Sequence, residues 1–271
     1  MFATVRDPNN PGSLELLEKC QFNDKMSVIQ MDVTNEEMIN KCYERVKNEL
    51  EIKGYQLWAV VNNAGRLAYG HTEWGQMDEY FKEFDVNVFG VVRVTRKFLP
   101  LIRPIQGRIV IVSALNGRMT LDNMAAHSMS KYALISYSDA LRREMRKFNV
   151  KVSTIEPGLF KTALYFSAET VLENTWNQTN EEIRQIYGQK YYEEHISHLK
   201  FYKKLGMGSY NIEIVIKDMI DAIISNKPKR SYKPVPNLIY KLFYTFLPII
   251  PQGIIDFVFH AIDKTIPDAM K

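Results

Sequence analysis

Short apolar runs rich in β-branched residues alternate along the chain with longer stretches of helical periodicity. The apolar runs cover residues 2–5, 27–33, 57–61, 108–114 and 150–156. Apolar residues recur every three or four positions near 36–53, 76–101 and 128–147. Strands that alternate with helices form right-handed crossovers and a parallel sheet. Such a sheet is covered on both faces, which explains why its strands are apolar throughout. We therefore predict an α/β fold with a doubly wound parallel sheet.

Turn-forming residues follow three of these runs directly. They form the segments NNAG (62–65), SALNGRM (113–119) and EPGLFKT (156–162). Any one of them alone is typical of a loop. Three such segments at the ends of successive strands predict a ligand cleft, because ligands bind at the carboxyl ends of the strands in open parallel sheets.

Aromatic and polar residues dominate residues 163–210, where the segment EEIRQIYGQKYYEEHI has helical spacing. An insertion of this kind after the last strand-end loop is typical of a lid over an apolar ligand. A helical pair packed on the domain is the plainer interpretation, and the two are compatible. With no repeat or low-complexity segment, residues 1–271 are interpreted as one domain.

The C-terminal segment 226–271 combines basic and apolar character. Five lysines or arginines and no acid lie between Ala222 and Ile255. Prolines and the polar residues Gln252 and Asp256 argue against a helix that spans a bilayer. The segment either lies on a membrane surface or packs against the domain. Packing against the domain is the interpretation that we favour.

Composition excludes several classes of protein. The formal charge of +4 is modest and spread out, so we expect no nucleic-acid partner. Cys20 and Cys42 are too few for a disulfide framework and are interpreted as thiols of an intracellular, reducing compartment. His195 and His198 are interpreted as surface residues, and no metal is predicted. The first residues contain no apolar signal-peptide core, so no signal peptide is expected.

Four motifs together resemble the short-chain dehydrogenase/reductase family over nearly the whole chain. They are NNAG, DVNVFG (85–90), SKYAL (130–134) and PGLFKT (157–162). Further segments, such as GRIVIVS and YSDALRREM, are similar to the branch with retinol, 17β-hydroxysteroid and D-β-hydroxybutyrate dehydrogenases. The resemblance implies a Rossmann-like fold and hydride transfer between NAD(P) and a small apolar alcohol or ketone. It also implies a homodimer through the helices 76–101 and 128–147, and association with the endoplasmic reticulum or mitochondrial membrane.

The family's catalytic groups are carried over only in part. Asn87 matches the family's asparagine, and Lys131 matches its lysine. His127 stands at the position of the tyrosine that accepts the hydroxyl proton. Ala114 stands at the position of the serine that holds the substrate oxygen, with Ser113 one residue early. The resemblance therefore predicts Asn87, His127, Lys131 and Ser113 as the catalytic set, with two of the four groups altered.

His127 and Lys131 share one helical face because they are four residues apart. A neutral imidazole with a pKa near ~6.5 is a reasonable base. The imidazolium formed in the reaction, however, would lie beside the Lys131 ammonium, which disfavours it. Imidazole is also shorter than a phenol, and a misplacement of ~1 Å costs about 10²-fold in rate. Ser113 is expected to point to the opposite face of its strand. We therefore expect weak or absent redox turnover.

The family pattern opens with a strand, a TGxxxGxG loop and a helix that together bind the cofactor pyrophosphate. No such segment is found, and Met1 aligns with the second strand of the fold. We therefore expect that the first β-α unit is missing from this chain. A gap in the centre of the sheet is then expected, as is weak or absent cofactor binding.

The other cofactor positions are implied by the resemblance. Arg6 matches the basic residue that accommodates a 2′-phosphate and favours NADP(H) over NAD(H); a solvated arginine at a strand end is the alternative. Asp32 and Val33 match the adenine contact, and Lys131 matches the contact to the nicotinamide ribose. The remaining positions flank the cleft on its adenosine and nicotinamide sides: Asn62, Ala64, Gly65, Pro157, Gly158 and Thr162.

Two hypotheses follow for the function. The first is an impaired oxidoreductase of the retinol, steroid or hydroxybutyrate branch. The second is a non-catalytic protein that keeps the fold and binds an apolar ligand or a membrane surface. Nothing in residues 163–210 selects one substrate over another.

Overall fold

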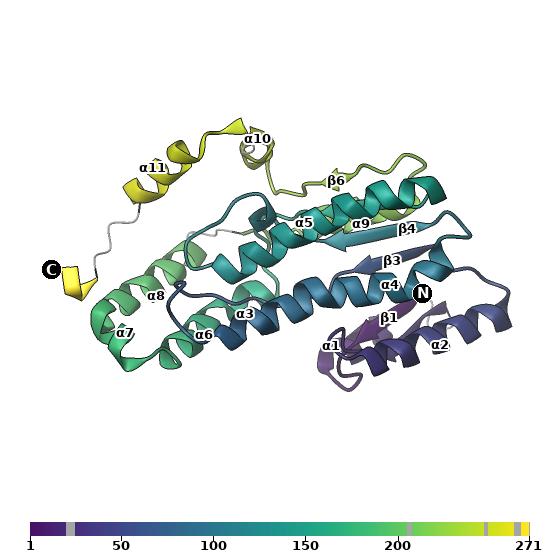
Figure 1. Ribbon diagram of the computed structural model, residues 1–271, viewed down its shortest axis with the longest axis horizontal. Coiled ribbons are helices and arrows are strands. Elements are labelled where there is room, and N and C mark those ends of the chain that lie inside the picture. Colours follow the sequence, from purple (N-terminus) through teal and green to yellow (C-terminus); the bar gives the residue numbers. More distant parts are fainter. Residues whose placement is uncertain (20–24, 205–207, 247–248, 263–266, 271) are drawn as a thin grey trace.

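Short parallel strands form the centre of the protein (Figure 1). The computed structural model describes residues 1–19, 25–204, 208–246, 249–262 and 267–270. The strands in these ranges are β1 (Phe2–Val5), β2 (Ser27–Gln30), β3 (Ala59–Asn62), β4 (Arg108–Val112), β5 (Lys151–Ile155) and β6 (Ser231–Tyr232). The prediction of an α/β fold with parallel strands is confirmed. The two-residue β6 has no counterpart among the predicted runs.

The predicted helices are present with small shifts. The stretch 36–53 is α2 (Glu36–Lys53), and 128–147 is α5 (Ala125–Met145). The stretch 76–101 divides into α3 (Met77–Phe84), a π-helical turn (Asp85–Gly90) and α4 (Val91–Ile102). The remaining helices are α1 (Pro11–Lys19), α6 (Ala163–Asn177), α7 (Glu181–Tyr187), α8 (Gln189–Lys204), α9 (Glu213–Ile224), α10 (Leu238–Phe246) and α11 (Gln252–Ile262).

Local sequence explains where α2 begins and ends. The Asn35 side chain accepts a hydrogen bond from the Met38 amide, which satisfies a free N–H of the first turn. Gly54 ends the helix with a positive φ of 65° that favours glycine. The buried positions repeat at helical spacing: Ile39, Cys42, Val46 and Leu50. Burial raises the pKa of the Cys42 thiol to about 11, so it is a core residue and unreactive. Cys20 lies outside the described residues.

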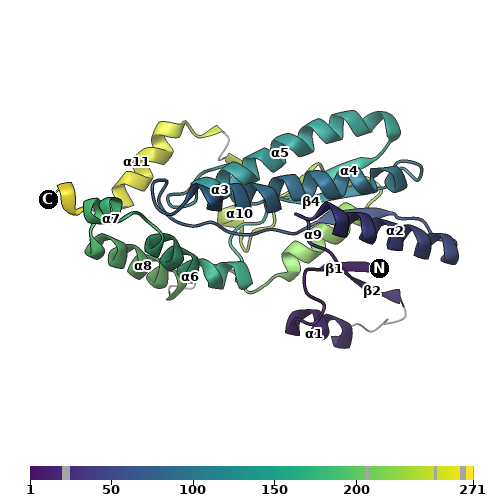
Figure 2. The same cartoon turned by 60° about the horizontal axis from the view of Figure 1, so that its bottom comes forward.

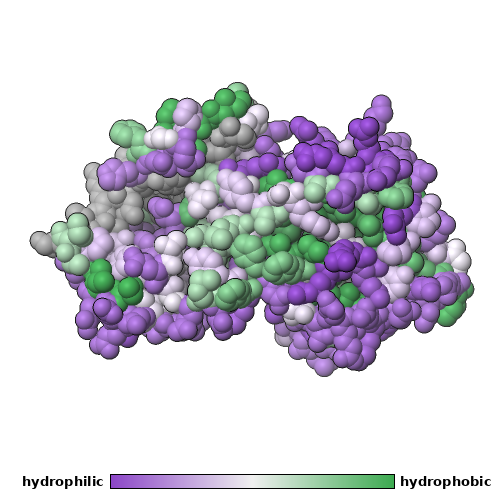
Figure 3. All heavy atoms as spheres, viewed as in Figure 1, coloured by the Kyte–Doolittle hydropathy of each residue, from purple (hydrophilic) through white to green (hydrophobic). Residues whose placement is uncertain are grey.

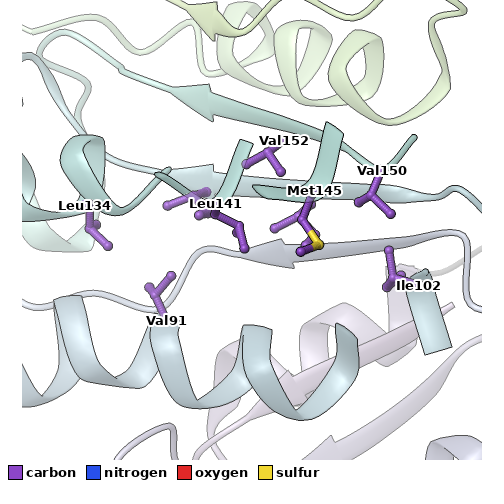
Figure 4. Packing of buried hydrophobic residues seen from close by; sticks show 9 residues of the cluster. Val91, Ile102, Leu134, Leu141, Met145, Val150 and Val152 are labelled. Carbon is purple, nitrogen blue, oxygen red and sulfur yellow. The ribbon is translucent and has the colours of Figure 1, made fainter. Parts of the chain in front are cut away.

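Helices cover both faces of the sheet (Figures 1 and 2). On one face α4 and α5 pack against β4 and β5, and on the other α9 packs against β4, β5 and β6. Figure 4 shows the first cluster, in which Leu134, Leu141 and Met145 of α5 point toward Val91 and Ile102 of α4 and toward Val150 and Val152. Ile109 and Ile111 of β4 complete it and are at most 1% exposed. This layering holds the carboxyl ends of β3, β4 and β5 at one edge.

Hydrogen bonding divides the strands into two sheets. β1 pairs with β2, and the second sheet has the order β3-β4-β5-β6. Among the described residues no ladder joins β1 to β3, although β1 and β2 lie beyond β3 as seen from β4 (Figure 1). Side chains connect the two sheets instead, because Phe2, Leu57 and Val60 contact one shared apolar cluster. The proposed absence of a first β-α unit stays a prediction.

Residues 163–204 form α6, α7 and α8, which lie at the end toward which the β4 arrow points (Figure 1). The C-terminal segment is anchored through α10. Its Tyr244 side chain is 1% exposed and donates a hydrogen bond to the Glu156 carbonyl at 3.2 Å. α11 instead exposes large apolar side chains, including Ile254 and Phe257.

None of the helices in the described ranges is long and apolar enough to cross a membrane.

We predict that Leu134→Ala lowers the free energy of unfolding by about 2–5 kcal/mol, because Leu134 is 1% exposed and its truncation leaves a cavity between α5 and β4. The control is Ile52→Ala on α2, where the side chain is 85% exposed and the change should stay within about 0.5 kcal/mol. Urea unfolding followed by circular dichroism measures both. Equal losses for the two variants would contradict the assigned core.

Candidate active site

The site lies where α5 passes the carboxyl end of β4. The ammonium of Lys131 donates a hydrogen bond to the carbonyl of Val112, the last residue of β4, at 3.3 Å. The Lys131 side chain thus crosses from the helix to the sheet edge. Burial lowers the pKa of Lys131 to about 8, although the nearby Glu83 carboxylate acts in the opposite direction. An amine with this pKa is partly neutral near physiological pH.

A buried ion-pair geometry holds His127 one turn before Lys131. Its Nδ1 lies 2.7 Å from Oε1 of Glu83, and the two side chains are 5% and 0% exposed. Asn87 Nδ2 donates to the same Oε1 at 2.7 Å. A carboxylate oxygen can only accept hydrogen bonds. A neutral imidazole bonded to Glu83 Oε1 must therefore carry its proton on Nδ1. The nitrogen left with a lone pair is then Nε2.

Asn87 connects this pair to the loop after β3. It lies in the π-helical turn, a feature that is frequent at functional sites. Its Oδ1 accepts the Arg66 amide at 2.8 Å, and its Nδ2 donates to the Arg66 carbonyl at 3.1 Å. Nδ2 also lies 3.1 Å from Ser130 Oγ on α5. The Asn87 amide therefore fixes three elements around Glu83: α3, α5 and the strand-end loop.

The predicted hydroxyl position has a different environment. Ser113 is 3% exposed, and its Oγ donates to the Lys131 carbonyl at 3.0 Å. Its hydroxyl thus contacts the α5 backbone within the core. Ala114 beside it is half-buried, has extended backbone and carries no hydroxyl. A catalytic role for Ser113 stays a prediction.

A buried carboxylate fixes the loop that follows β4. Glu156, at the end of β5, is 0% exposed and accepts two hydrogen bonds of 3.0 Å from Arg118. It also accepts from the hydroxyls of Thr154 and Ser231. Burial alone would raise the pKa of Glu156, but these donors hold it below its usual value. The strand-end loop of β4 is thereby tied to β5 and β6.

Residues predicted to bind the nicotinamide side of a cofactor meet at this edge. Pro157 accepts the Leu115 amide at 2.9 Å, and the Gly158 amide donates to Pro234 at 3.0 Å. Thr162, which is exposed, immediately precedes α6. A Cβ built on Gly65 would lie 3.8 Å from Lys131 Nζ, so the exposed loop 63–65 borders the lysine.

Residues predicted on the adenosine side lie farther along the same edge. Arg6 is exposed, and its positive charge is one of the causes that hold the pKa of Asp32 low, after the Thr34 backbone hydrogen bond. Val33 packs on Gly90. Asn62 is 6% exposed and donates to Thr95 Oγ1 at 3.1 Å, so its amide contacts α4. Ala64 is exposed.

The residues around Lys131 fit the nicotinamide end of a dinucleotide cofactor. Lys131 can hold ribose hydroxyls, and the loops that contain Gly65 and Gly158 leave backbone open beside it. A Gly-rich pyrophosphate loop is not found in the described ranges.

The helices of residues 163–210 are held by aromatic packing. Trp176 and Tyr191 are buried with Trp74 of the loop after β3. His71 Nε2 lies 3.2 Å from His195 Nε2 across this contact. His195 is therefore half-buried, and its interpretation as a surface residue is wrong, whereas His198 is exposed as predicted. Among the described residues no group of three metal-binding side chains is found.

Sequence reasoning missed Glu83. It lies four residues before Asn87, so both side chains share a helical face. That spacing was the available signal. An acid in an amphipathic helix is usually solvated, however, and only the packing of α3 against α5 shows that this one is buried.

We predict that Lys131 makes stability depend on alkaline pH. Its folded-state pKa of about 8 is below the unfolded value of ~10.4, so between these values the unfolded chain binds more protons. The contribution of Lys131 to the free energy of unfolding therefore rises with pH across this window. Urea midpoints of the wild type and Lys131→Met, measured at several pH values between about 7.5 and 10.5, should diverge in favour of the wild type. A constant difference would refute the burial of a charged ammonium.

Comparison with known proteins completes the description of the site. The family model described as "short chain dehydrogenase" matches residues 3–170. The chain is 34% identical to the mitochondrial D-beta-hydroxybutyrate dehydrogenase of Bos taurus, over 85% of this chain and 67% of that protein. It is 36% identical to the 17-beta-hydroxysteroid dehydrogenase type 6 of Rattus norvegicus, over 88% of this chain and 74% of that protein. It is 37% identical to the retinol dehydrogenase 16 of Mus musculus, over 90% of this chain and 75% of that protein.

Solved structures show the same fold. A short-chain dehydrogenase/reductase from Burkholderia phymatum in complex with NAD has a TM-score of 0.67 at 18% identity and covers 95% of this chain and 85% of its own. A short chain dehydrogenase from Burkholderia cenocepacia in complex with NADP has a TM-score of 0.66 at 16% identity and covers 95% and 96%. The fold thus accommodates either cofactor.

Proposed function

The chain belongs to the short chain dehydrogenase family, and from this premise we propose that it acts on the CH–OH group of a small apolar alcohol, or on the matching ketone, with NAD(P). The relatives are named for hydroxybutyrate, a hydroxysteroid and retinol. A retinol-like or steroid-like alcohol is the substrate class that suits the aromatic segment 163–210.

One observation carries the proposal. A proton-accepting side chain and an ammonium, His127 and Lys131, lie on successive turns of α5 beside the carboxyl end of β4. This is the edge where open parallel sheets bind ligands.

When bound, the nicotinamide supplies the hydride acceptor for the substrate carbon. Lys131 would hold the nicotinamide ribose. His127 Nε2 would take the hydroxyl proton, while the Nδ1–H group of His127 stays hydrogen-bonded to Glu83. Asn87 keeps Glu83 in place through its 2.7 Å hydrogen bond. Arg6 supports NADP(H) over NAD(H), because a guanidinium can bind a 2′-phosphate.

Turnover in this chain is proposed to be weak. Ala114 offers no hydroxyl to the substrate oxygen, and Ser113 donates its own to the α5 backbone. Lys131 would repel the imidazolium formed when Nε2 takes a proton, although the Glu83 carboxylate 2.7 Å from Nδ1 offsets part of that repulsion.

We predict that restoring the family's groups raises activity only when Glu83 is also changed. In His127→Tyr with Ala114→Ser the new phenol would lie beside the Glu83 carboxylate, which raises the pKa of a phenol. Adding Glu83→Leu removes that carboxylate. The triple variant should oxidise retinol or a hydroxysteroid at least about 10²-fold faster than wild type, the lower range for a positioned acid–base group. NAD(P)H formation measures the rate.

The control is the triple variant with Lys131→Met added, which should return to the wild-type rate. High activity of the unmodified chain would refute the proposed impairment. If the triple variant binds NADP(H) but stays inactive on every alcohol tried, the oxidoreductase proposal itself is wrong.

A second candidate function is binding of a membrane surface or an apolar ligand without catalysis. The observation in its favour is the C-terminal apolar face, which we define as the exposed residues Leu242, Phe246, Ile249, Ile254 and Phe257. Their exposed fractions run from 50% to 76%. Exposed apolar helices beside basic residues suit a bilayer surface.

We predict for this candidate that the chain co-sediments with phosphatidylcholine vesicles and that Ile254→Ser with Phe257→Ser reduces the bound fraction about tenfold, because two apolar side chains no longer enter the interface. Ile52→Ser, at a position of α2 that is 85% exposed, is the control and should have no effect. Unchanged sedimentation of the double variant would exclude this face.

We further propose a homodimer. Phe89 and Met129, which are 51% and 52% exposed, belong to an apolar surface over the π-helical turn and α5, and Figure 3 shows hydrophobic side chains gathered over the neighbouring α3, α4 and α5. Burial of this surface against a second copy would remove it from water. We also propose, from the C-terminal apolar face, that the protein associates with the mitochondrial or endoplasmic reticulum membrane.

A further inference from the structure

A basic pocket lies at the end of the sheet opposite the candidate active site. Its volume is about 250 Å³. It is formed by the end of α5, the first residues of β5 and the segment before β6, whereas Lys131 and Pro157 lie near the other ends of these elements. Its lining consists of Arg142, Arg143, Arg146, Val150, Lys151, Val152, Ser153, Pro228 and Arg230.

Five cationic side chains converge here from three parts of the chain. Arg142 and Arg146 are four residues apart and share a helical face. Lys151 begins β5, and Arg230 immediately precedes β6. Basic residues at the end of a helix complement its dipole, which accounts for the arginines of α5. It does not account for Lys151 and Arg230, which the fold brings to the same pocket.

Few acids balance these charges. Asp139 lies 2.9 Å from Arg142 and 3.8 Å from Arg143. In the described part of the chain no carboxylate lies within ion-pair distance of Arg146, Lys151 or Arg230. Lys151 instead donates to the neutral amide of Asn149 at 2.7 Å. The pocket therefore carries a surplus of positive charge.

The shortness of β6 opens the pocket floor. Lys151 donates its amide to Gly107 on the β4 side, whereas the Thr154 amide donates to Arg230 on the β6 side. Alternation along a strand then directs the Val152 amide to the β6 side. β6 begins at Ser231, in register with Thr154, so no strand lies beside Val152. Its backbone borders the pocket together with the buried Ser153.

We propose that this basic pocket binds a compact anion that carries two or more phosphate groups. Guanidinium groups bind phosphate oxygens through paired hydrogen bonds, and several around one pocket match several phosphates. The volume exceeds the needs of a single phosphate. The ligand is an inositol phosphate or a short polyphosphate, free in solution or as a lipid headgroup.

The test is titration calorimetry of the full chain with tripolyphosphate and with inositol hexakisphosphate. Arg146→Gln with Arg230→Gln should raise the Kd about tenfold or more, because two charged hydrogen-bond donors are lost. The control is Lys200→Gln with Lys217→Gln, which removes the same charge from exposed positions outside the pocket and should leave the Kd within about twofold. Matching urea midpoints show that the variants remain folded.

Vesicles distinguish the two sources of the phosphate groups. Binding to vesicles that contain phosphatidylinositol bisphosphate, without binding to the soluble anions, assigns a lipid headgroup, and soluble binding assigns a free ligand. Either result supports the proposal when the double variant loses it. The proposal is overturned if no probe binds, if the control pair weakens binding as much as the pocket pair, or if only RNA or DNA binds.

Discussion

The arrangement of the site depends on one buried carboxylate. Glu83 has no exposed side-chain surface, yet its Oε1 accepts hydrogen bonds from Asn87 and from His127. A buried carboxylate without donors is costly, so α3, the π-helical turn and α5 are constrained to keep these partners in reach. Its Oε2 has no partner among the described residues. The positions of His127 and Lys131 on α5 thus depend on a residue from another helix.

A second buried carboxylate lies directly after β5. Glu156 is also fully buried, and four donors from three segments surround it. The two carboxylates fix the loops after β3 and β4 from opposite sides. Lys131 lies between these loops, where its charge is desolvated. These hydrogen-bonded loops around a buried lysine are the physical basis on which ligand binding at this edge is proposed.

Most strands and helices of this fold could be predicted from the sequence, because their signals are local. The apolar runs and the helical stretches have periods that depend only on local geometry, so five strands and three helices were placed within a few residues. Asn87 and Lys131 could be named as candidates because each lies in a short contiguous motif. Glu83, the contact of His71 with His195, and the convergence of Lys151 with Arg230 join distant segments, and no local pattern indicates them. β6 is too short for a periodic signal and exists through its pairing with β5.

The division of the strands into two sheets affects how the molecule opens. β1 and β2 share no backbone ladder with β3 among the described residues and are held by side chains of the α2 and α4 cluster. Apolar packing without cross-strand hydrogen bonds allows a part of a protein to detach while the rest stays folded. We therefore expect the amides of β1 and β2 to exchange with solvent before those of β4 and β5. Arg6, which follows β1 and is predicted to contact the adenosine end of a cofactor, would then be held in place only while these two strands stay docked.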